Sequence, residues 1–194
     1  MTVKDRGITR RGFVTLALAA AALAPVPALA GDHPSMAYMR KVAKDLLHAH
    51  RQGTVSSFYN AISRHADVSG IALVSLGQYK SKLSGGQRAR YYRGVATFMA
   101  RYFADQSRLY PVAKYELGDA QSEGDEVLIP SKVFLMSGRT YTVSWRLAWR
   151  GKGYKVIDAK MLGFSLVSLQ RGLFSSYISK RNGDVNALVA ALDR

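Results

Sequence analysis

The stretch YTVSWRLAWRGKGYKVID, residues 141–158, alternates apolar and polar side chains up to a glycine-rich turn. Alternate side chains of a β-strand point to opposite faces, so this pattern predicts a strand with one apolar and one polar face. Gly151-Lys152-Gly153 predicts a tight turn into a second, antiparallel strand. The apolar face carries three large aromatic side chains and consists of Tyr141, Val143, Trp145, Leu147 and Trp149. Such a face packs either on the protein's own helices or on something that the protein carries.

Further strands are predicted upstream of this hairpin. Residues 112–122 and 126–137 read as two strands, and Ser137-Gly138 predicts the turn into the strand at 139–150. Pro130 has no backbone N–H, which indicates a bulge or an edge at that position. Together with residues 154–162, the sequence predicts a four-stranded antiparallel meander.

Helices are predicted on both sides of the meander. Pro34 fits the first turn of a helix and Gly53 fits its end, while Ser69 is predicted to cap a short helix. Ser165 and Asp184 predict the caps of two C-terminal helices. An S-x-x-Q capping box at 84–87 predicts the start of a long helix, whose apolar stripe consists of Tyr91, Val95, Phe98 and Tyr102. The pattern predicts an α+β fold, with a helical N-terminal half, in a single domain at residues 31–194.

Residues 1–30 have the pattern of a cleaved signal peptide. Two arginines precede an apolar run at 13–24, and Ala28-Leu29-Ala30 forms an A-x-A cleavage pattern. The run has 12 residues, whereas a membrane-spanning helix needs about 20. Residues 9–13 resemble a twin-arginine export signal, and the general secretory route stays open. We therefore expect the mature chain in the periplasm of a Gram-negative bacterium.

The charge balance predicts anionic partners. The whole chain carries a net charge of +15, and removal of residues 1–30 leaves 24 basic and 12 acidic residues. Arginines and aromatics lie on opposite faces of the strand at 139–150, which is not the pattern of a nucleic-acid stacking platform. The periplasmic address and this pattern favour lipid headgroups, membranes or acidic protein surfaces as partners.

The sequence gives little support for catalysis. It has no cysteine and no H-E-x-x-H, G-x-S-x-G or phosphate-loop motif, so we expect neither an enzyme nor a metal or cofactor site. Asp158 is the exception, because it shares the strand parity of Tyr154 and Val156 and would point into the apolar face. It is either a buried base with a raised pKa or, as we favour, a structural carboxylate bound to an arginine or to backbone donors.

Residues 154–194 resemble the MlaC family, the periplasmic phospholipid-binding components of the Mla (toluene-tolerance) transport system. The resemblance rests on Y-K-V-x-D at 154–158, G-x-S-L-V at 163–167, Q-R-x-x-F-x-S-x-I at 170–178 and N-G-x-V-x-x-L at 182–188, with a further leucine at 192. It extends more loosely over the mature chain. Leu162 and Phe164 depart from it, since an acidic residue and a valine are common there. Some relatives are associated with hopanoid pathways.

The resemblance implies an apolar cavity between sheet and helices that takes acyl chains. It also implies shuttling of lipid between an inner-membrane ABC transporter complex and an outer-membrane lipoprotein complex, which maintains the lipid asymmetry of the outer membrane. We expect a monomer. Arg88 and Arg101 are the predicted headgroup contacts. The predicted pocket wall consists of Tyr91, Val95, Phe98, Tyr102, Val133, Leu135, Tyr141, Val143, Trp145, Leu147 and Trp149.

Three alternatives stay open at this point. The lipid could be a hopanoid or another lipid instead of a phospholipid. The protein could be a non-catalytic envelope interaction protein whose core is filled by its own side chains, because pockets and cores have the same composition. It could also be an enzyme that uses Asp158 as a base.

Overall fold

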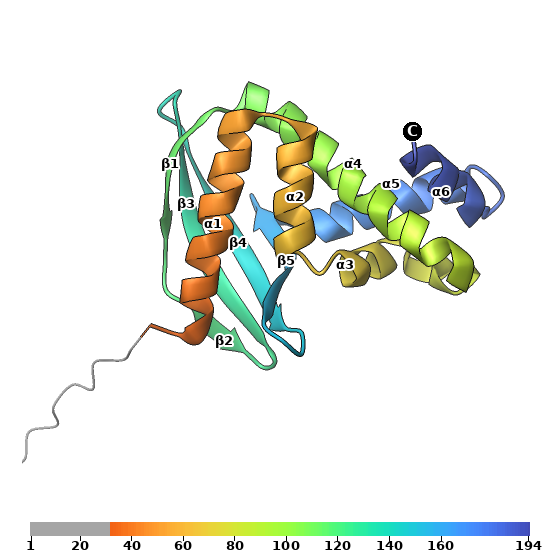
Figure 1. The fold of residues 1–194 in the computed structure, drawn as a ribbon, viewed down its shortest axis with the longest axis horizontal. Helices are drawn as coiled ribbons and strands as arrows, with labels where there is room; N and C mark the ends of the chain where they lie inside the picture. Colours follow the sequence, from red (N-terminus) through yellow and green to blue (C-terminus); the bar gives the residue numbers. More distant parts are fainter. Residues whose placement is uncertain (1–31) are drawn as a thin grey trace, which may run out of the picture. The chain divides into compact units, whose positions relative to one another are not determined.

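The computed structural model describes residues 32–194, which form one compact unit (Figure 1). The signal peptide predicted at 1–30 lies outside the described residues. The elements in chain order are α1 (Pro34–Gln52), α2 (Val55–His65), α3 (Val68–Ser75), η1 (Gly77–Lys82), η2 (Gly85–Gln87), α4 (Arg88–Leu109), β1 (Val112–Leu117), β2 (Gln121–Glu123), β3 (Glu126–Leu135), β4 (Thr140–Trp149), β5 (Tyr154–Met161), β6 (Phe164–Ser165), α5 (Leu166–Ser179) and α6 (Val185–Leu192).

The strands form one antiparallel sheet in the order β1-β3-β4-β5-β6, and β2 also pairs with β3. The strand predicted at 112–122 is split into β1 and β2 at Gly118, whose N–H donates to the Pro130 carbonyl at 2.8 Å. Pro130 lies in the interior strand β3 but opposite this break, where its missing N–H interrupts no ladder. The predicted α+β class and meander are confirmed, and β6 adds a short strand at the edge.

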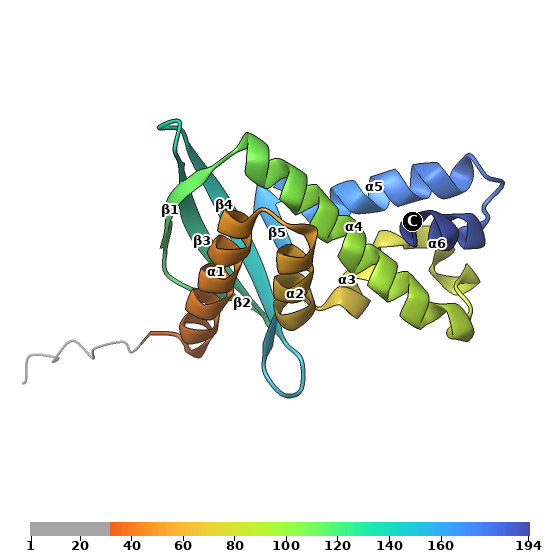
Figure 2. The same cartoon turned by 45° about the horizontal axis from the view of Figure 1, so that its top comes forward.

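Helix α1 covers part of one face of the sheet, which we call the inner face (Figures 1 and 2). Met39 and Val42 of α1 pack with Ile129 of β3 and Leu147 of β4 in one buried cluster. Val127, Leu147 and Val156 lie directly opposite one another on adjacent strands, and so do Ile129, Trp145 and Ala159. Because directly paired residues share a face, these rows define the inner face.

The remaining helices bury two further clusters besides the one between α1 and the sheet. Helix α4 packs on α2 along a row of small residues, Ala96, Ala100 and Ala104. The N-terminal half of α4 packs with α3, α5 and α6. Figure 2 shows that α4 reaches from the sheet to these helices. Tyr91 and Val95 are fully buried there, and the Tyr91 hydroxyl donates to the Ala72 carbonyl at 2.9 Å.

Most of the predicted helix limits are confirmed. Pro34 begins α1, and Gly53 ends it in the left-handed conformation with φ of 62°, which glycine adopts without strain. Ser165 accepts a hydrogen bond from the Ser168 N–H at 3.0 Å, and Asp184 caps α6 in the same way.

Two predicted caps are wrong. Asp67, and not Ser69, caps α3, because its carboxylate accepts the Gly70 N–H at 2.9 Å. The box at 84–87 opens a 3₁₀ turn, and the Ser84 hydroxyl bonds to the Gln87 side chain at 3.0 Å instead of the helix backbone.

Candidate functional site

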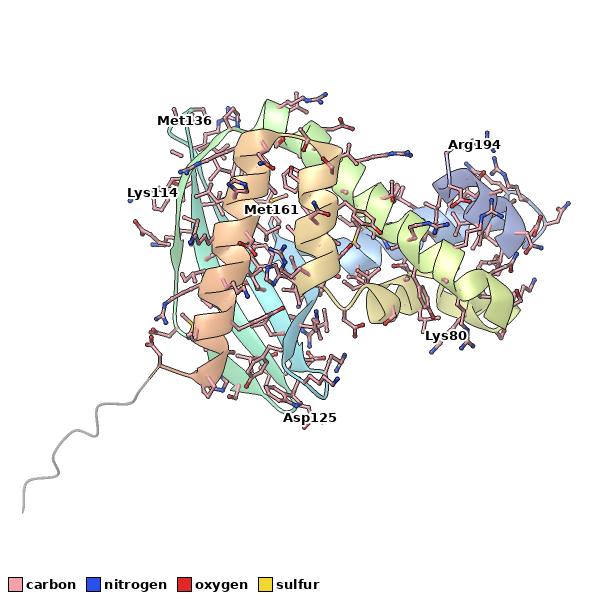
Figure 3. The ribbon with its side chains drawn as sticks, in the orientation of Figure 1. Lys80, Lys114, Asp125, Met136, Met161 and Arg194 are labelled. Atoms are coloured by element: carbon pink, nitrogen blue, oxygen red, sulfur yellow. The ribbon has the colours of Figure 1, made fainter. Side chains whose placement is uncertain are left out.

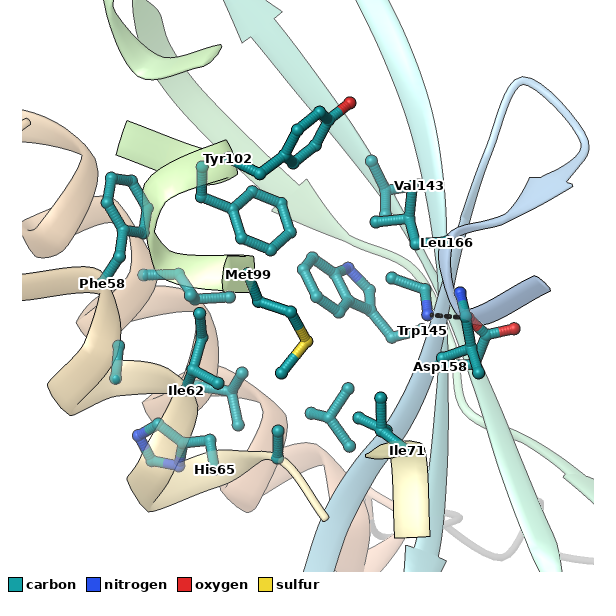
Figure 4. Close-up of a pocket in the computed structure, with 18 of the residues that line it drawn as sticks. Phe58, Ile62, His65, Ile71, Met99, Tyr102, Val143, Trp145, Asp158 and Leu166 are labelled. Carbon is teal, nitrogen blue, oxygen red and sulfur yellow. Dashed lines mark hydrogen bonds between the residues drawn. The ribbon is translucent and has the colours of Figure 1, made fainter. Parts of the chain in front are cut away.

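An apolar cavity of about 740 Å³ lies between the inner face of the sheet and helices α1, α2, α4 and α5. Figure 4 shows Phe58 and Ile62 of α2, Met99 and Tyr102 of α4 and Trp145 of β4 around this space. Packed protein cores rarely contain voids larger than a water molecule, whereas ligand cavities measure about 300–1,000 Å³. The inner face therefore has two parts. Near Leu147 it packs on α1, and near Trp145 it borders open space.

On the β4 and α5 sides of the cavity wall, the polar side-chain atoms are bound to other protein atoms. The Trp145 indole N–H donates to Ser131 Oγ at 2.9 Å, and the Ser131 hydroxyl donates to the Val143 carbonyl at 3.1 Å. On the α5 side, the Gln170 amide donates to Ser75 Oγ at 2.7 Å. Because these polar groups already have hydrogen-bond partners in the protein, they need none from a ligand, and these parts of the wall present apolar surface.

Two histidines lie in the wall at the α1–α2 side. His50 Nε2 accepts the Val112 N–H at 2.9 Å, and burial lowers the pKa of His50 below its usual value, so the ring is neutral at pH 7. His65 Nε2 lies 2.8 Å from Asp45 Oδ2, and this hydrogen bond holds the pKa of the Asp45 carboxyl below its ordinary value. His65 Nδ1 is buried without a partner among the described residues.

Asp158 does not lie where its parity predicts. Arg146 pairs with Asp158 and Leu147 pairs with Val156, so Ile157 is an extra residue that forms a β-bulge in β5. The bulge moves Asp158 to the row of Arg146 and gives its place on the inner face to Ala159. Asp158 Oδ1 accepts the Ala159 N–H at 2.8 Å and the Val167 N–H at 3.2 Å, at the boundary between the cavity and a smaller groove. These contacts agree with the favoured prediction that Asp158 is a structural carboxylate bound to backbone donors.

Five of the predicted wall residues lie around the cavity, and six do not. Those that line it are Phe98, Tyr102, Val133, Val143 and Trp145. Those that the structure places elsewhere are Tyr91, Val95, Leu135, Tyr141, Leu147 and Trp149. Tyr91 and Val95 belong to the core with α3, α5 and α6, and Leu147 is covered by α1. Trp149 lies 56% exposed at the end of β4, with its ring edge-on to Tyr154 at 5.2 Å.

Neither predicted headgroup arginine lines the cavity. Arg88 is the first residue of α4, ten residues before Phe98, which is about 15 Å along a helix. Arg101 donates through Nη2 to the carbonyl of Arg194 at 2.7 Å and so faces the C-terminus. The structure therefore places both arginines away from the cavity.

The cavity residues of α1, α2 and α5 were not among the residues predicted from the sequence. Leu46, Phe58, Ile62 and Leu173 are examples. Their helical periodicity was visible, but an apolar helix face predicts burial without distinguishing a packed core from a cavity wall. Tyr102, Leu169 and Leu173 both line the cavity and are exposed, so they mark its mouth.

Within residues 32–194, no group of three or more histidine, aspartate and glutamate side chains is arranged to hold a metal ion. No helix in the same range is long and apolar enough to cross a membrane.

Comparisons with known proteins agree with this geometry. A family model described as MlaC protein matches residues 37–194. The fold is similar to a phospholipid-binding protein from Ralstonia solanacearum, solved in complex with a phospholipid, with a TM-score of 0.68 and 21% sequence identity. The similarity covers 82% of this chain and 94% of that one. Among curated proteins, none matches this chain significantly.

Proposed function

Because this chain belongs to the MlaC family, we propose that its mature part is a periplasmic lipid carrier that holds the acyl chains of a phospholipid in the cavity. The observation that carries the proposal is the open apolar space of about 740 Å³ between sheet and helices. A filled core, as in an envelope interaction protein, would leave no such space.

The driving force is the removal of hydrocarbon from water. Each methylene transferred into an apolar site contributes about 0.8 kcal/mol, so acyl chains of ordinary length supply a large total. The wall meets this requirement because its indole, hydroxyl and amide groups are bound to one another around Trp145 and Gln170.

Carriage needs no covalent step. His50 Nε2 already accepts a backbone N–H, and two backbone N–H groups hold Asp158 through Oδ1, so both side chains have structural roles. Loading and release then depend only on the opening of the mouth at Tyr102, Leu169 and Leu173. We therefore propose a carrier and not an enzyme.

We also propose that the carrier works as a monomer between an inner-membrane ABC transporter complex and an outer-membrane lipoprotein complex, in the maintenance of outer-membrane lipid asymmetry. The excess of basic residues supports this, because it favours encounters with acidic proteins and anionic membranes.

The two tryptophans of β4 provide a matched test. Trp145→Arg places a charge in the cavity wall, whereas Trp149→Arg places the same charge at an exposed site of the same strand. After purification from the periplasm, lipid extraction and mass spectrometry should find lipid with the wild type and Trp149→Arg but not with Trp145→Arg. Equal lipid content in folded samples of both variants would contradict the proposal. The mass of the extracted lipid distinguishes a phospholipid from a hopanoid.

A further inference from the structure

Large exposed apolar side chains gather around the mouth of the cavity. Twelve such side chains are exposed in residues 32–194, and half of them lie on the mouth residues of α4 and α5 or on the β5–β6 hairpin next to them. We call this set the collar, and it consists of Tyr102, Met161, Leu162, Phe164, Leu169 and Leu173. Large exposed apolar patches on proteins mark sites of interaction with other proteins or with membranes.

The strand register joins the collar to the cavity wall. Val143 lines the cavity and pairs directly with Met161, which in turn pairs directly with Phe164. Directly paired residues lie on the same face, so Met161 and Phe164 continue the inner face of the sheet outward. Phe164 is 64% exposed. A hydrocarbon chain leaving the cavity past Val143 therefore finds apolar surface up to the edge of the sheet.

The tip of the β5–β6 hairpin carries a leucine where local geometry favours a different residue. Leu162 and Gly163 form the two-residue turn, with φ of 53° and 82°. This turn type favours asparagine or glycine at its first position, because other residues are strained in the left-handed conformation. Leu162 is also 68% exposed, so no internal packing compensates for the strain. A residue that costs stability in the free protein indicates a contact made outside it.

Basic residues accompany the collar, and Asp158, the acidic residue nearest to the hairpin, is bound to backbone N–H groups. Lys160 pairs with Ser165 on the face of the hairpin opposite Met161, and Arg139 lies at the β3–β4 turn, at the same end of the sheet. On α4, Asp105 is one turn from Tyr102, but Arg108 lies 4.0 Å from its carboxylate. The opposite end of the sheet carries both signs of charge, with Asp119, Glu123, Asp125 and Glu126 beside Arg150, Lys152 and Lys155. Figure 3 shows Met136 of the β3–β4 turn and Asp125 at opposite ends of the sheet.

We propose that the collar docks on the surface of an anionic bilayer, with Leu162 and Phe164 inserted among the headgroups and Lys160 and Arg139 on anionic lipids. This inference rests on the proposed carrier function. Protruding apolar side chains flanked by cations are the usual means of binding at a membrane interface. Docked in this way, the mouth opens toward the leaflet, and acyl chains pass between cavity and bilayer without crossing water.

The test uses vesicle flotation with the purified mature protein. The wild type should float with vesicles that contain phosphatidylglycerol and much less with pure phosphatidylcholine vesicles, and high salt should weaken the binding. The variant Leu162→Asn with Phe164→Ser should bind at least about tenfold more weakly, because two inserted side chains are lost. Leu162→Asn suits the left-handed turn, so this variant should remain folded. Trp149→Ser, an exposed aromatic away from the collar, should bind like the wild type.

Three outcomes would overturn the proposal: no flotation of the wild type, equal flotation of the collar variant, or equal losses in the collar variant and Trp149→Ser. Lipid extraction from the same samples distinguishes this failure from failure of the carrier function. If lipid co-purifies with a wild type that does not float, the collar does not bind membranes and the carrier proposal stands. If no lipid co-purifies, the carrier proposal itself fails.

Discussion

The Trp145 indole N–H donates a hydrogen bond of 2.9 Å to Ser131 Oγ, which joins the largest side chain of the cavity wall to the neighbouring strand β3. The Ser131 hydroxyl in turn donates to the Val143 carbonyl at 3.1 Å. Through these two bonds, the polar side-chain atoms of Trp145 and Ser131 have hydrogen-bond partners within the sheet. An aromatic ring can thus border the cavity without leaving a donor that hydrocarbon could not satisfy.

Ser131→Ala should destabilise the fold, because it leaves the Trp145 N–H without its acceptor. An unsatisfied buried donor costs about 1–3 kcal/mol, and urea unfolding followed by tryptophan fluorescence measures the loss. Ser122→Ala, on the exposed strand β2, is the control and should change stability by less than about 0.5 kcal/mol. Equal effects of the two substitutions would show that the Ser131 hydrogen bond has no special role.

A matched pair of alanines tests whether the space is open. Ala43 of α1 lines the cavity, whereas Ala100 of α4 is fully buried in the contact with α2. Ala43→Leu should keep its stability and reduce the bound lipid, because the added atoms enter open space. Ala100→Leu should lose about 1–3 kcal/mol through overpacking. If Ala43→Leu is destabilised as much as Ala100→Leu, the space around Ala43 is already filled.

His50 should make stability depend on pH. Burial lowers its pKa in the folded state, so the unfolded chain binds the proton more readily as the pH falls. The stabilising contribution is complete above the unfolded pKa of about 6.5 and is lost as the pH falls toward the folded value. Thermal unfolding of His50→Gln, whose amide oxygen can still accept the Val112 N–H, should depend less on pH in this window. His48→Gln, at an exposed site of α1, should retain the wild-type dependence. The reverse pattern would rule out His50 as the source.

Arg88 and Arg101 should be dispensable for lipid retention, despite their prediction as headgroup contacts. Neither lines the cavity, and Arg101 is bound to the Arg194 carbonyl. The double variant Arg88→Ala with Arg101→Ala should co-purify with as much lipid as the wild type in quantitative mass spectrometry. A loss of more than half of the lipid would restore these arginines to the site.

The sequence predicted the sheet and its apolar face because the strand period is local. Val143, Trp145 and Leu147 share that face, as their alternation predicts. What alternation cannot predict is which part of the face a helix covers, because this depends on the path of α1. Leu147 is therefore core and Trp145 is cavity wall, although the two residues are only two positions apart.

The predicted face of Asp158 was wrong for a different reason, although its predicted structural role agrees with the two backbone N–H groups that it accepts. Its parity with Val156 placed it on the inner face, but the bulge at Ile157 reverses the parity within two residues. No glycine or other local signal marks this bulge in the sequence. The cavity residues of α1, α2 and α5 were missed because an open wall and a packed core both require apolar helix faces.

Native mass spectrometry of the wild-type mature protein, purified from the periplasm without detergent, tests the central claim most directly. The account predicts a reproducible mass above that of residues 31–194, which collisional activation removes as intact lipid. A clean mass of the polypeptide alone, from cells rich in phospholipid, would contradict it.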